Sequence, residues 1–437
     1  MRSIMLNRSA VSVAVGLALG TLGNGASAAG FALMEQNASG IGNAYAGAAA
    51  VAEDAGTIYF NPAGMTRIRG RQVVGAVSLI TPSSKFYDSG ASSVPLLQSP
   101  GGGNGGDAGG LAAVPAGYLS WELQPDKLWL GISLNSPFGL STEWDSGWVG
   151  RFHAIESSVQ ALTINPSIAW KVNDQFSLGG GFSVQRMSAT FTNATPYSLL
   201  AASLSIPGVG AGREGVAKVD GDSTAYGWNI GAMFQPSPST RIGASYRSKI
   251  KHDIEGDVTF ADRPPQLGAV VPDGPAQAKV TVPDSFSLAI AHDVNARWQV
   301  LADYSWTGWN SIQQLTIARP TGQPISSVNL AFKDSWRMGL GANYRVDEQW
   351  TLRFGTAYDT TPVQDVHRTP RLPDSDKIWA SIGAQWRANP NLAIDAGFAY
   401  VWIGDGSSNL ASASAGNLVG EYKSSTWVLG AQVRYNF

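Results

Sequence analysis

The 437-residue chain contains no cysteine, and only 14% of its residues are charged. The absence of cysteine excludes disulfide scaffolds and thiolate metal sites. In soluble proteins about a quarter of the residues are charged, so this chain lacks the surface of an ordinary soluble domain. Its formal net charge of −2 provides no basic surface for nucleic acid. We therefore expect no metal, no cofactor and no nucleic-acid partner.

Long hydrophobic runs are also missing once the first 28 residues are set aside. No later segment has the 18 or more apolar residues that a transmembrane helix needs, which excludes a helical membrane protein. Residues 1–28 have the pattern of a secretory signal peptide, with Arg2 and Arg8 before an apolar stretch from Ala10 to Leu22 and an Ala26-Ser27-Ala28 cleavage site. We expect export and a mature N-terminus at Ala29.

The remainder of the chain is marked by alternation. From residue 71 onward, apolar residues recur at every second position, which is the period of a β-strand. In the last segment, Trp427, Leu429 and Val433 fall on one face, whereas Gln432 and Arg434 fall on the other. About fourteen such runs follow one another, near residues 72–86, 111–124, 127–137, 157–172, 175–192, 221–235, 240–260, 277–293, 297–318, 329–346, 349–360, 375–387, 391–403 and 421–437.

The links between these runs alternate between short and long. The short links are 124–127, 172–175, the turn around Pro236 and Pro238, 293–296, 346–349 and 388–391. The long links are 87–110, 138–156, 193–220, 261–276, 319–328, 361–374 and 404–420. Loops sorted by length in this way are typical of an outer-membrane barrel and not of a soluble sandwich. The sequence therefore predicts an all-β membrane protein, a 14-stranded antiparallel barrel over residues 71–437, in the bacterial outer membrane.

Residues 29–70 do not alternate. They are rich in small side chains and contain three acidic residues, Glu35, Glu53 and Asp54. A short helix is predicted after Asn61, because asparagine is a favoured N-cap and Pro62 suits the first helical position. A segment with so little charge is better placed in the lumen than in the periplasm. We therefore expect a small N-terminal helical plug.

At this point the sequence resembles the FadL family, the outer-membrane transporters of long-chain fatty acids and other hydrophobic compounds. The matching motifs run in the family's order over essentially the whole mature chain: Ala29-Gly30-Phe31, Ser39-Gly40-Ile41-Gly42, Ala44-Tyr45, Asp54-Ala55-Gly56, Asn61-Pro62-Ala63, Pro137-Phe138-Gly139-Leu140-Ser141-Thr142-Glu143, Gly227-Trp228-Asn229, Ser245-Tyr246-Arg247-Ser248, Phe332-Lys333-Asp334 and Leu372-Pro373-Asp374. The resemblance implies passive uptake of a long-chain fatty acid or another hydrophobic small molecule. It also implies that Phe31, Asn61, Pro62 and Ala63 belong to a hatch inside the barrel.

Pro137 lies inside the third run, where a proline breaks a hydrogen bond of the strand ladder. We expect a kink at Ser136, Pro137, Phe138 and Gly139. The resemblance implies that this kink leaves a hole in the wall, that the Asn61-Pro62-Ala63 hatch touches it, and that ligand leaves through it sideways into the lipid. The alternative is that Pro137 simply ends the strand before the loop at 138–156.

Two long loops are unusually apolar for a surface exposed to water. The resemblance places a ligand-capture groove between them, and its candidate residues are Tyr197, Leu199, Leu200, Leu204, Ile206, Val270 and Val271. The alternative is that the two loops pack against each other as a lid.

A fatty acid carboxylate inside a lumen needs a cation or several N–H donors. The two positions at which fatty acid transporters of the family place Arg and Lys align here with Asn193 and Val328. Other candidates for binding the head group are basic residues that alternate with apolar ones along a strand and are therefore predicted to face the lumen, namely Arg247, Lys249, Lys251, Arg337 and Arg353. They could instead pair with lumen acids such as Asp253, Glu255, Asp303 and Asp395, which leaves open a cargo without a carboxylate, such as an aromatic or alkane hydrocarbon.

The sequence disfavours two other function classes. A general diffusion porin needs an open, charged constriction, whereas this lumen face is rich in glycine and serine and follows a plug. An outer-membrane enzyme would need a histidine beside a nucleophile and a carboxylate, and His153, His252, His292 and His367 offer no such constellation. We therefore expect no catalytic residues. We expect a monomer whose C-terminal Phe437 is presented to the barrel assembly machinery.

Overall fold

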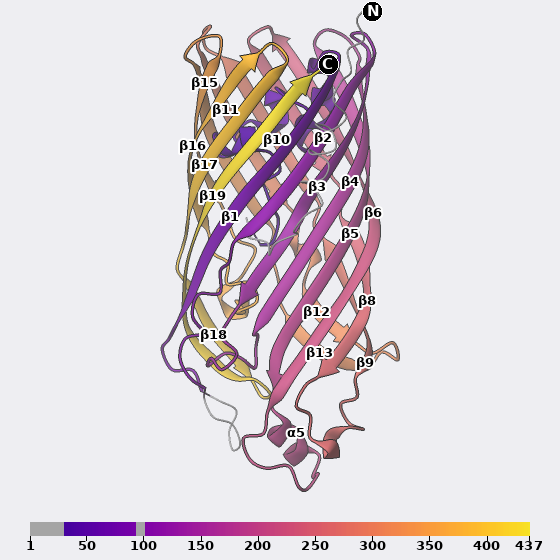
Figure 1. Ribbon diagram of the computed structural model, residues 1–437, viewed down its shortest axis with the longest axis vertical. Helices are drawn as coiled ribbons and strands as arrows, with labels where there is room; N and C mark the ends of the chain where they lie inside the picture. The colour runs from indigo at the N-terminus through magenta and orange to yellow at the C-terminus, as the bar shows by residue number, and fades with distance from the viewer. Residues whose placement is uncertain (1–29, 93–100) are drawn as a thin grey trace, which may run out of the picture.

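The computed structural model describes residues 30–92 and 101–437, so the signal peptide expected at 1–28 lies outside the described residues. The described residues form one antiparallel sheet that curls around a lumen (Figure 1). The first strand, β1 (Arg71–Asp88), pairs with the last, β19 (Gly416–Asn436), and this pairing closes the barrel. Among the described residues, no helix is long and apolar enough to cross a membrane.

The barrel has fourteen spans, as the alternation predicts. Nineteen strands occur in the described part of the chain, and five consecutive pairs of them share one span each. The remaining strands are β2 (Ala112–Gln124), β3 (Leu128–Glu143), β4 (Glu156–Lys171), β5 (Phe176–Thr195), β6 (Gly215–Ser237), β7 with β8 (Thr240–Arg247, Ile250–Phe260), β9 with β10 (Gly274–Val282, Ser285–Asp293), β11 with β12 (Trp298–Thr307, Gln314–Ala318), β13 with β14 (Pro324–Asn329, Ser335–Arg345), β15 (Trp350–Asp359), β16 (Lys377–Asn389) and β17 with β18 (Leu392–Ile403, Gly406–Ser412).

Short helices fill the lumen near the barrel end at which the C-terminus lies (Figure 1). They are α2 (Ala38–Ile41), α3 (Ala48–Val51), α4 (Thr57–Phe60) and the 3-10 helix η1 (Pro62–Arg67). We call residues 30–70 the plug. The long loops lie at the opposite end and carry α5 (Tyr197–Ser203) and η2 (Pro265–Leu267); two further turns, η3 (Trp309–Ser311) and η4 (Asp365–His367), lie in other links between strands.

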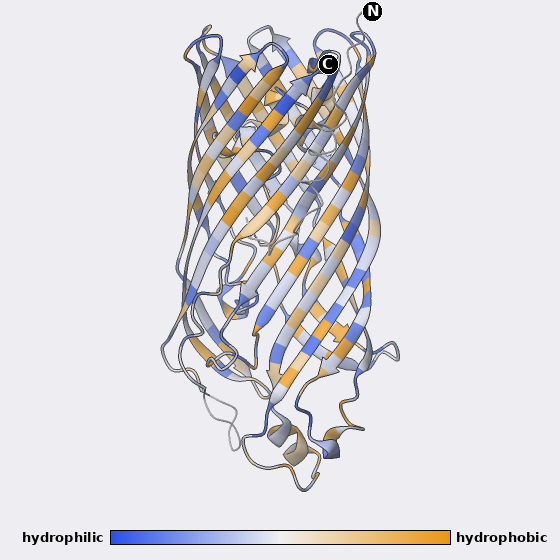
Figure 2. Ribbon diagram, in the orientation of Figure 1, coloured by the Kyte–Doolittle hydropathy of each residue, from blue (hydrophilic) through white to orange (hydrophobic). Residues whose placement is uncertain are grey.

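The alternation separates a lipid-facing surface from a luminal one. In Figure 2 it is visible along the strands, where orange residues alternate with pale or blue ones. On β19, Leu429 is 47% exposed, whereas Val428 beside it is fully buried. Five of the exposed tryptophans lie near the short turns, where aromatic girdles mark the edge of a bilayer: Trp121, Trp170, Trp298, Trp350 and Trp386.

The strands reach further toward the long loops than the alternation predicts. Half of the link predicted at 319–328 is strand, because β13 begins at Pro324, and most of the predicted link 404–420 belongs to β18 and β19. At this end both faces of a strand carry polar residues, such as Ser326 and Ser327, which are both exposed. A strand with two polar faces shows no hydropathy period, so the sequence pattern ends before the strand does.

β7 and β8 share one span but alternate out of phase. Arg247 lies opposite Asn229 on β6, whereas Glu255 lies opposite Asp222, so the register shifts by one residue between the two strands. A shift of one residue moves every later side chain to the other face. As a result, Ile250, His252 and Ile254 are buried toward the lumen. Lys249 and Lys251, which alternate with them, are turned outward.

Candidate transport path and plug

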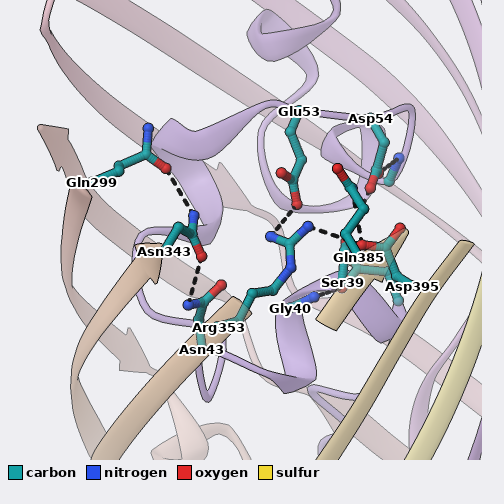
Figure 3. A network of polar contacts seen from close by, with 12 residues as sticks. Ser39, Gly40, Asn43, Glu53, Asp54, Gln299, Asn343, Arg353, Gln385 and Asp395 are labelled. Carbon is teal, nitrogen blue, oxygen red and sulfur yellow. Dashed lines mark hydrogen bonds and ion pairs between the residues drawn. The ribbon is translucent and has the colours of Figure 1, made fainter. Parts of the chain in front are cut away.

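The plug is fixed to the barrel wall by buried ion pairs (Figure 3). Arg353 projects from β15 into the lumen, where its Nη1 lies 2.6 Å from Glu53 Oε1 of the plug and its Nη2 lies 2.8 Å from Asp395 Oδ1 of β17. The side chains of Arg353 and Asp395 are only 2% and 1% exposed. A charge buried this deeply is stable only when it is paired, so Arg353 ties the plug and two strands together.

Neutral and acidic side chains extend this network (Figure 3). Asp54 of the plug accepts hydrogen bonds from Ser39 Oγ (3.0 Å) and from Gln432 Nε2 of β19 (2.8 Å). On another part of the wall, Asn43 Nδ2 donates to Asn343 Oδ1 (3.0 Å). The plug is therefore anchored on several sides of the lumen.

Arg337 is a second anchor. Its Nη1 lies 3.2 Å from Asp303 Oδ2, both side chains are 5% exposed, and its Nη2 donates to the carbonyl oxygen of Ala44 in the plug. Arg337 and Arg353, predicted as candidates for binding a head group, are thus both engaged by carboxylates, which is the alternative given for them. Asp303 and Asp395, the lumen acids considered as alternative partners, neutralise them.

The Asn61-Pro62-Ala63 motif packs against β5 and β6. Asn61 caps η1 through its Oδ1, and its Nδ2 donates to the carbonyl oxygens of Ala49 (2.8 Å) and Ala232 (3.0 Å). A Cβ atom at Gly231 would lie 2.1 Å from Asn61 Oδ1, so glycine is needed there for the close approach. The hydrogen bonds of Asn61 go to the plug itself and to β6, and contact of the motif with residues 136–139 stays a prediction.

The third strand has a bulge where proline predicts one. Asn135 pairs with Thr163 of β4 and Phe138 pairs with Ala161, so three steps on β3 correspond to two steps on β4. The strand continues after the bulge to Glu143, so Pro137 does not end it. The pairing of β3 with β2 ends at the pair Leu134 and Gly117, so β3 has no β2 partner beyond Leu134. The second half of β3 therefore has an edge that the neighbouring strand leaves uncovered.

Residues 31–36 of the plug cover that edge. Leu33 N donates to Pro137 O (2.9 Å), and Gly139 N donates to Phe31 O (2.9 Å), so Ala32 and Phe138 form an antiparallel bridge. Gln36 completes the cover by accepting from Ser136 N through Oε1 (3.2 Å) and donating through Nε2 to Ser136 O (2.8 Å). We call residues 31–36 the edge segment. Sequence reasoning missed Gln36, because nothing local to it signals a strand 100 residues away.

Three aromatic rings meet where the edge segment begins. The Phe31 ring lies 4.9 Å from Trp309 and 5.7 Å from Phe138 between centroids. Gly30 N donates to Asp374 Oδ2 (3.0 Å), and Asp374 is paired with Lys377. The Leu372-Pro373-Asp374 motif thus holds the start of the edge segment against the rings.

Two cavities lie on either side of this aromatic cluster. The outer cavity, toward the long loops, is apolar and includes Phe31, Leu140, Met187, Ile254, Ile312 and Phe332 in its lining. The inner cavity lies beside the plug and includes Leu33, Phe60, Pro137, Phe138, Asn229 and Arg247. Phe31 borders the first cavity and Phe138 the second, so the aromatic cluster separates an apolar chamber from the kink.

The remaining candidates for binding a head group fall into two groups. Arg247 lines the inner cavity, donates to Tyr59 O (2.7 Å) and stacks over the Tyr59 ring, with no carboxylate at ion-pair distance among the described residues. Lys249 and Lys251 face outward, because the register shift between β7 and β8 reverses the predicted parity. Of the two positions aligned with basic residues of the family, Val328 lines the outer cavity, and Asn193 accepts a hydrogen bond from Arg371 (3.3 Å).

The two apolar loops pack mainly against each other. Tyr197 and Leu267 are fully buried, and Leu200, Ile206 and Val271 pack around them. Leu204 and Val270 remain exposed, and Leu199 is half-buried. This arrangement is the lid considered as an alternative, with an apolar rim on its surface.

Comparison with known proteins agrees with this architecture. A family model described as "Outer membrane protein transport protein (OMPP1/FadL/TodX)" matches residues 20–437. The chain is 28% identical over 424 residues to the long-chain fatty acid transport protein of Escherichia coli O6:H1, covering 91% of each chain. It is 30% identical over 424 residues to outer membrane protein P1 of Haemophilus influenzae, covering 90% of each.

Solved structures show the same fold. The crystal structure of a Pseudomonas aeruginosa FadL homologue matches 94% of this chain and all of its own, with a TM-score of 0.86 and 29% identity. The toluene transporter TodX of Pseudomonas putida matches with a TM-score of 0.70 at 17% identity, covering 94% of this chain and 100% of its own, a likeness that concerns the fold alone.

Proposed function

The chain belongs to the FadL family of outer-membrane transport proteins, and from this premise we propose that it carries long-chain fatty acids by a lateral route. The protein is a β-barrel of the bacterial outer membrane that transports hydrophobic compounds. In the proposed route, cargo is captured at the apolar rim of the long loops, enters the outer cavity, passes the aromatic cluster and leaves through the wall at the kink of β3.

The observation that carries the proposal is the edge of β3 beyond Leu134. It lacks β2 as a partner and is covered instead by the edge segment, which belongs to the plug and not to the wall. The hydrogen bonds of the edge segment to Pro137 and Gly139 join two stretches of chain that are far apart in sequence, and they can be broken without unfolding any wall strand. Movement of a few residues therefore suffices to connect the inner cavity with the gap beside β2.

A lateral exit suits an apolar cargo on energetic grounds. Each CH₂ group gains about 0.8 kcal/mol by staying out of water, so a long acyl chain is held back strongly from an aqueous pore. Release into the bilayer through the wall avoids that cost. The anchors of Arg353 and Arg337 support a route in which most of the plug stays in place and the edge segment moves.

Uptake of uncharged hydrocarbons by the same path is the second candidate. The apolar lining of the outer cavity favours any hydrophobic compound of suitable length. A general porin is disfavoured, because the plug occupies the lumen and is tied to the wall by Arg353 through Glu53 and by Arg337 through the carbonyl oxygen of Ala44. The proposal is transport without catalysis.

Two proposals concern partners. We take the protein to act as a monomer, since each barrel holds its own cavities and plug. Phe437 is 67% exposed at the end of the last strand, with its N–H bonded to Arg71 O (2.9 Å), which leaves its ring available to the assembly machinery.

The test of the transport proposal is uptake of labelled oleate by cells that lack their own fatty acid transporter and express this protein. We expect uptake that saturates with oleate and is absent from cells carrying an empty vector. No uptake, together with a large ion conductance of the purified protein in planar bilayers, would favour a porin and contradict the proposal.

A further inference from the structure

Arg371 stands out in the lining of the outer cavity. It lies in the link between η4 and β16, beside Leu372, and both residues line the cavity. Its guanidinium stacks over the Phe191 ring with 5.2 Å between the guanidinium carbon and the ring centroid. An arginine is thus placed at the wall of a chamber whose other lining residues are mostly aliphatic and aromatic.

The partners of Arg371 are all neutral. Nη1 donates to Glu156 O (3.2 Å) and Ser157 Oγ (3.0 Å), and Nη2 donates to Asn193 Oδ1 (3.3 Å). No carboxylate lies within ion-pair distance in the part of the chain that the structure describes. These bonds use three of the five guanidinium N–H groups. The charge is therefore left with the Phe191 ring and neutral acceptors, and without a counter-ion among the described residues.

Arg371 is half-buried, and its situation differs from that of the fully buried arginines. Arg353 and Arg337 are each paired with a carboxylate at 3.2 Å or less. Asp220 borders the same cavity as Arg371, but it is exposed and lies 3.9 Å from Lys218. Burial lowers the pKa of Arg371 to about 10, so the group still carries its charge at neutral pH. A positive charge at the wall of an apolar cavity, without a counter-ion, is stabilised when an anion enters the cavity.

We propose that Arg371 binds the carboxylate of the cargo in the outer cavity, with the acyl chain lying against Leu140, Met187 and Phe332. This inference rests on the proposed transport function and deepens it, because it assigns the cargo class: an amphiphile with one anionic head and an apolar tail, not a hydrocarbon. Ser157 and Asn193 hold the guanidinium in position through its Nη atoms and do not neutralise it. Arg371 is therefore the residue that selects a carboxylate.

The experiment compares two ligands that differ only in the head group. Oleate and oleyl alcohol are titrated at mildly alkaline pH against the full-length protein in lipid nanodiscs, free of detergent that would fill the cavity. The wild type is compared with Arg371→Gln and Arg371→Lys. Arg186→Gln serves as control, because Arg186 is 68% exposed on β5 and does not line the cavity.

We expect the wild type to bind oleate more tightly than the alcohol. Arg371→Gln should weaken oleate binding by about 10- to 100-fold, the range for losing a hydrogen bond to a charged group, and leave alcohol binding nearly unchanged. Arg371→Lys should restore part of the preference, and Arg186→Gln should match the wild type.

Equal loss of both ligands in Arg371→Gln would show a role in the wall and overturn the inference, as would unchanged oleate binding. A wild type that binds the alcohol as tightly as oleate would also overturn it, while leaving hydrophobic transport in place. A wild type that binds neither ligand would overturn the transport proposal itself.

Discussion

The Phe31 ring lies edge-on to Trp309, with 4.9 Å between centroids, and closes the outer cavity on the side of the kink. The relationship joins the first residues of the plug to a 3-10 turn between β11 and β12. Phe31 is 9% exposed and Trp309 is fully buried. Because Phe31 is also bonded through its carbonyl to Gly139, the ring that closes the cavity belongs to the segment that covers the edge of β3.

Replacing Phe31 by Ala should open the passage between the two cavities. We expect a fluorescent fatty acid to leave the purified variant in nanodiscs several times faster than it leaves the wild type, since the barrier side chain is removed. Stopped-flow dissociation measures this rate. Phe182→Ala is the control, because Phe182 is 51% exposed on the outer face of β5; equal dissociation rates in all three proteins would show that Phe31 does not form the barrier.

Replacing Arg353 by Gln should loosen the plug. The change leaves Asp395 and Glu53 without their counter-charge, and breaking a buried pair in this way costs about 3–5 kcal/mol. We expect a higher ion conductance in planar bilayers. The double variant Arg353→Gln/Asp395→Asn also neutralises the partner of Arg353 and should recover part of the docking of the plug. As a control, Arg186→Gln, at an exposed position, should behave as the wild type. Conductance as low as that of the wild type would argue against an anchoring role.

The edge segment should dock more weakly as pH rises through mildly acidic values. Burial raises the pKa of Glu35 from its usual value to about 7, with Asp359 adding to the rise. Glu35 loses its proton at a lower pH when the edge segment is undocked than when it is docked. The stabilisation of the docked state is therefore greatest below about pH 4.5, decreases between about pH 4.5 and 7, and is constant above that.

Hydrogen exchange of amides 33–36, corrected for the intrinsic rate, measures this docking. Protection should be greater at about pH 5 than at about pH 8, and Glu35→Gln, which stays neutral, should remove the difference. Glu348→Gln, at an exposed turn, should keep it. The same pH dependence in Glu35→Gln would assign the effect to another group.

Replacing Lys249 and Lys251 together by Gln should leave oleate binding and uptake unchanged. Both side chains are exposed outside the lumen, because the register of β8 is shifted against that of β7. Titration of the double variant in nanodiscs checks this expectation. A loss comparable to that expected for Arg371→Gln would place these lysines on the ligand path and contradict the orientation described above.

The strands of the wall are well predicted from the sequence, because alternate residues face lipid and lumen and hydropathy therefore repeats every two residues. Pro137 likewise predicts the bulge, since any strand must lose a ladder bond at a proline. The prediction of which side chains face the lumen fails after Arg247, because the one-residue register shift there leaves no signal in the hydropathy pattern. Arg371 was missed for another reason: its partners at 156, 157 and 193 come from strands that are distant in sequence, so only the folded chain shows that no acid is near it.

The edge segment can be locked to β3 by a disulfide, because the chain has no cysteine of its own. Ala32 and Phe138 form a non-hydrogen-bonded antiparallel pair, and Cα atoms of such pairs lie about 4.5 Å apart, within reach of a disulfide. Oleate uptake is measured for Ala32→Cys/Phe138→Cys before and after reduction, with each single variant as control. The account predicts that oxidation blocks uptake in the double variant alone and that reduction restores it. Equal uptake by the oxidised and reduced double variant would contradict lateral release past the edge segment.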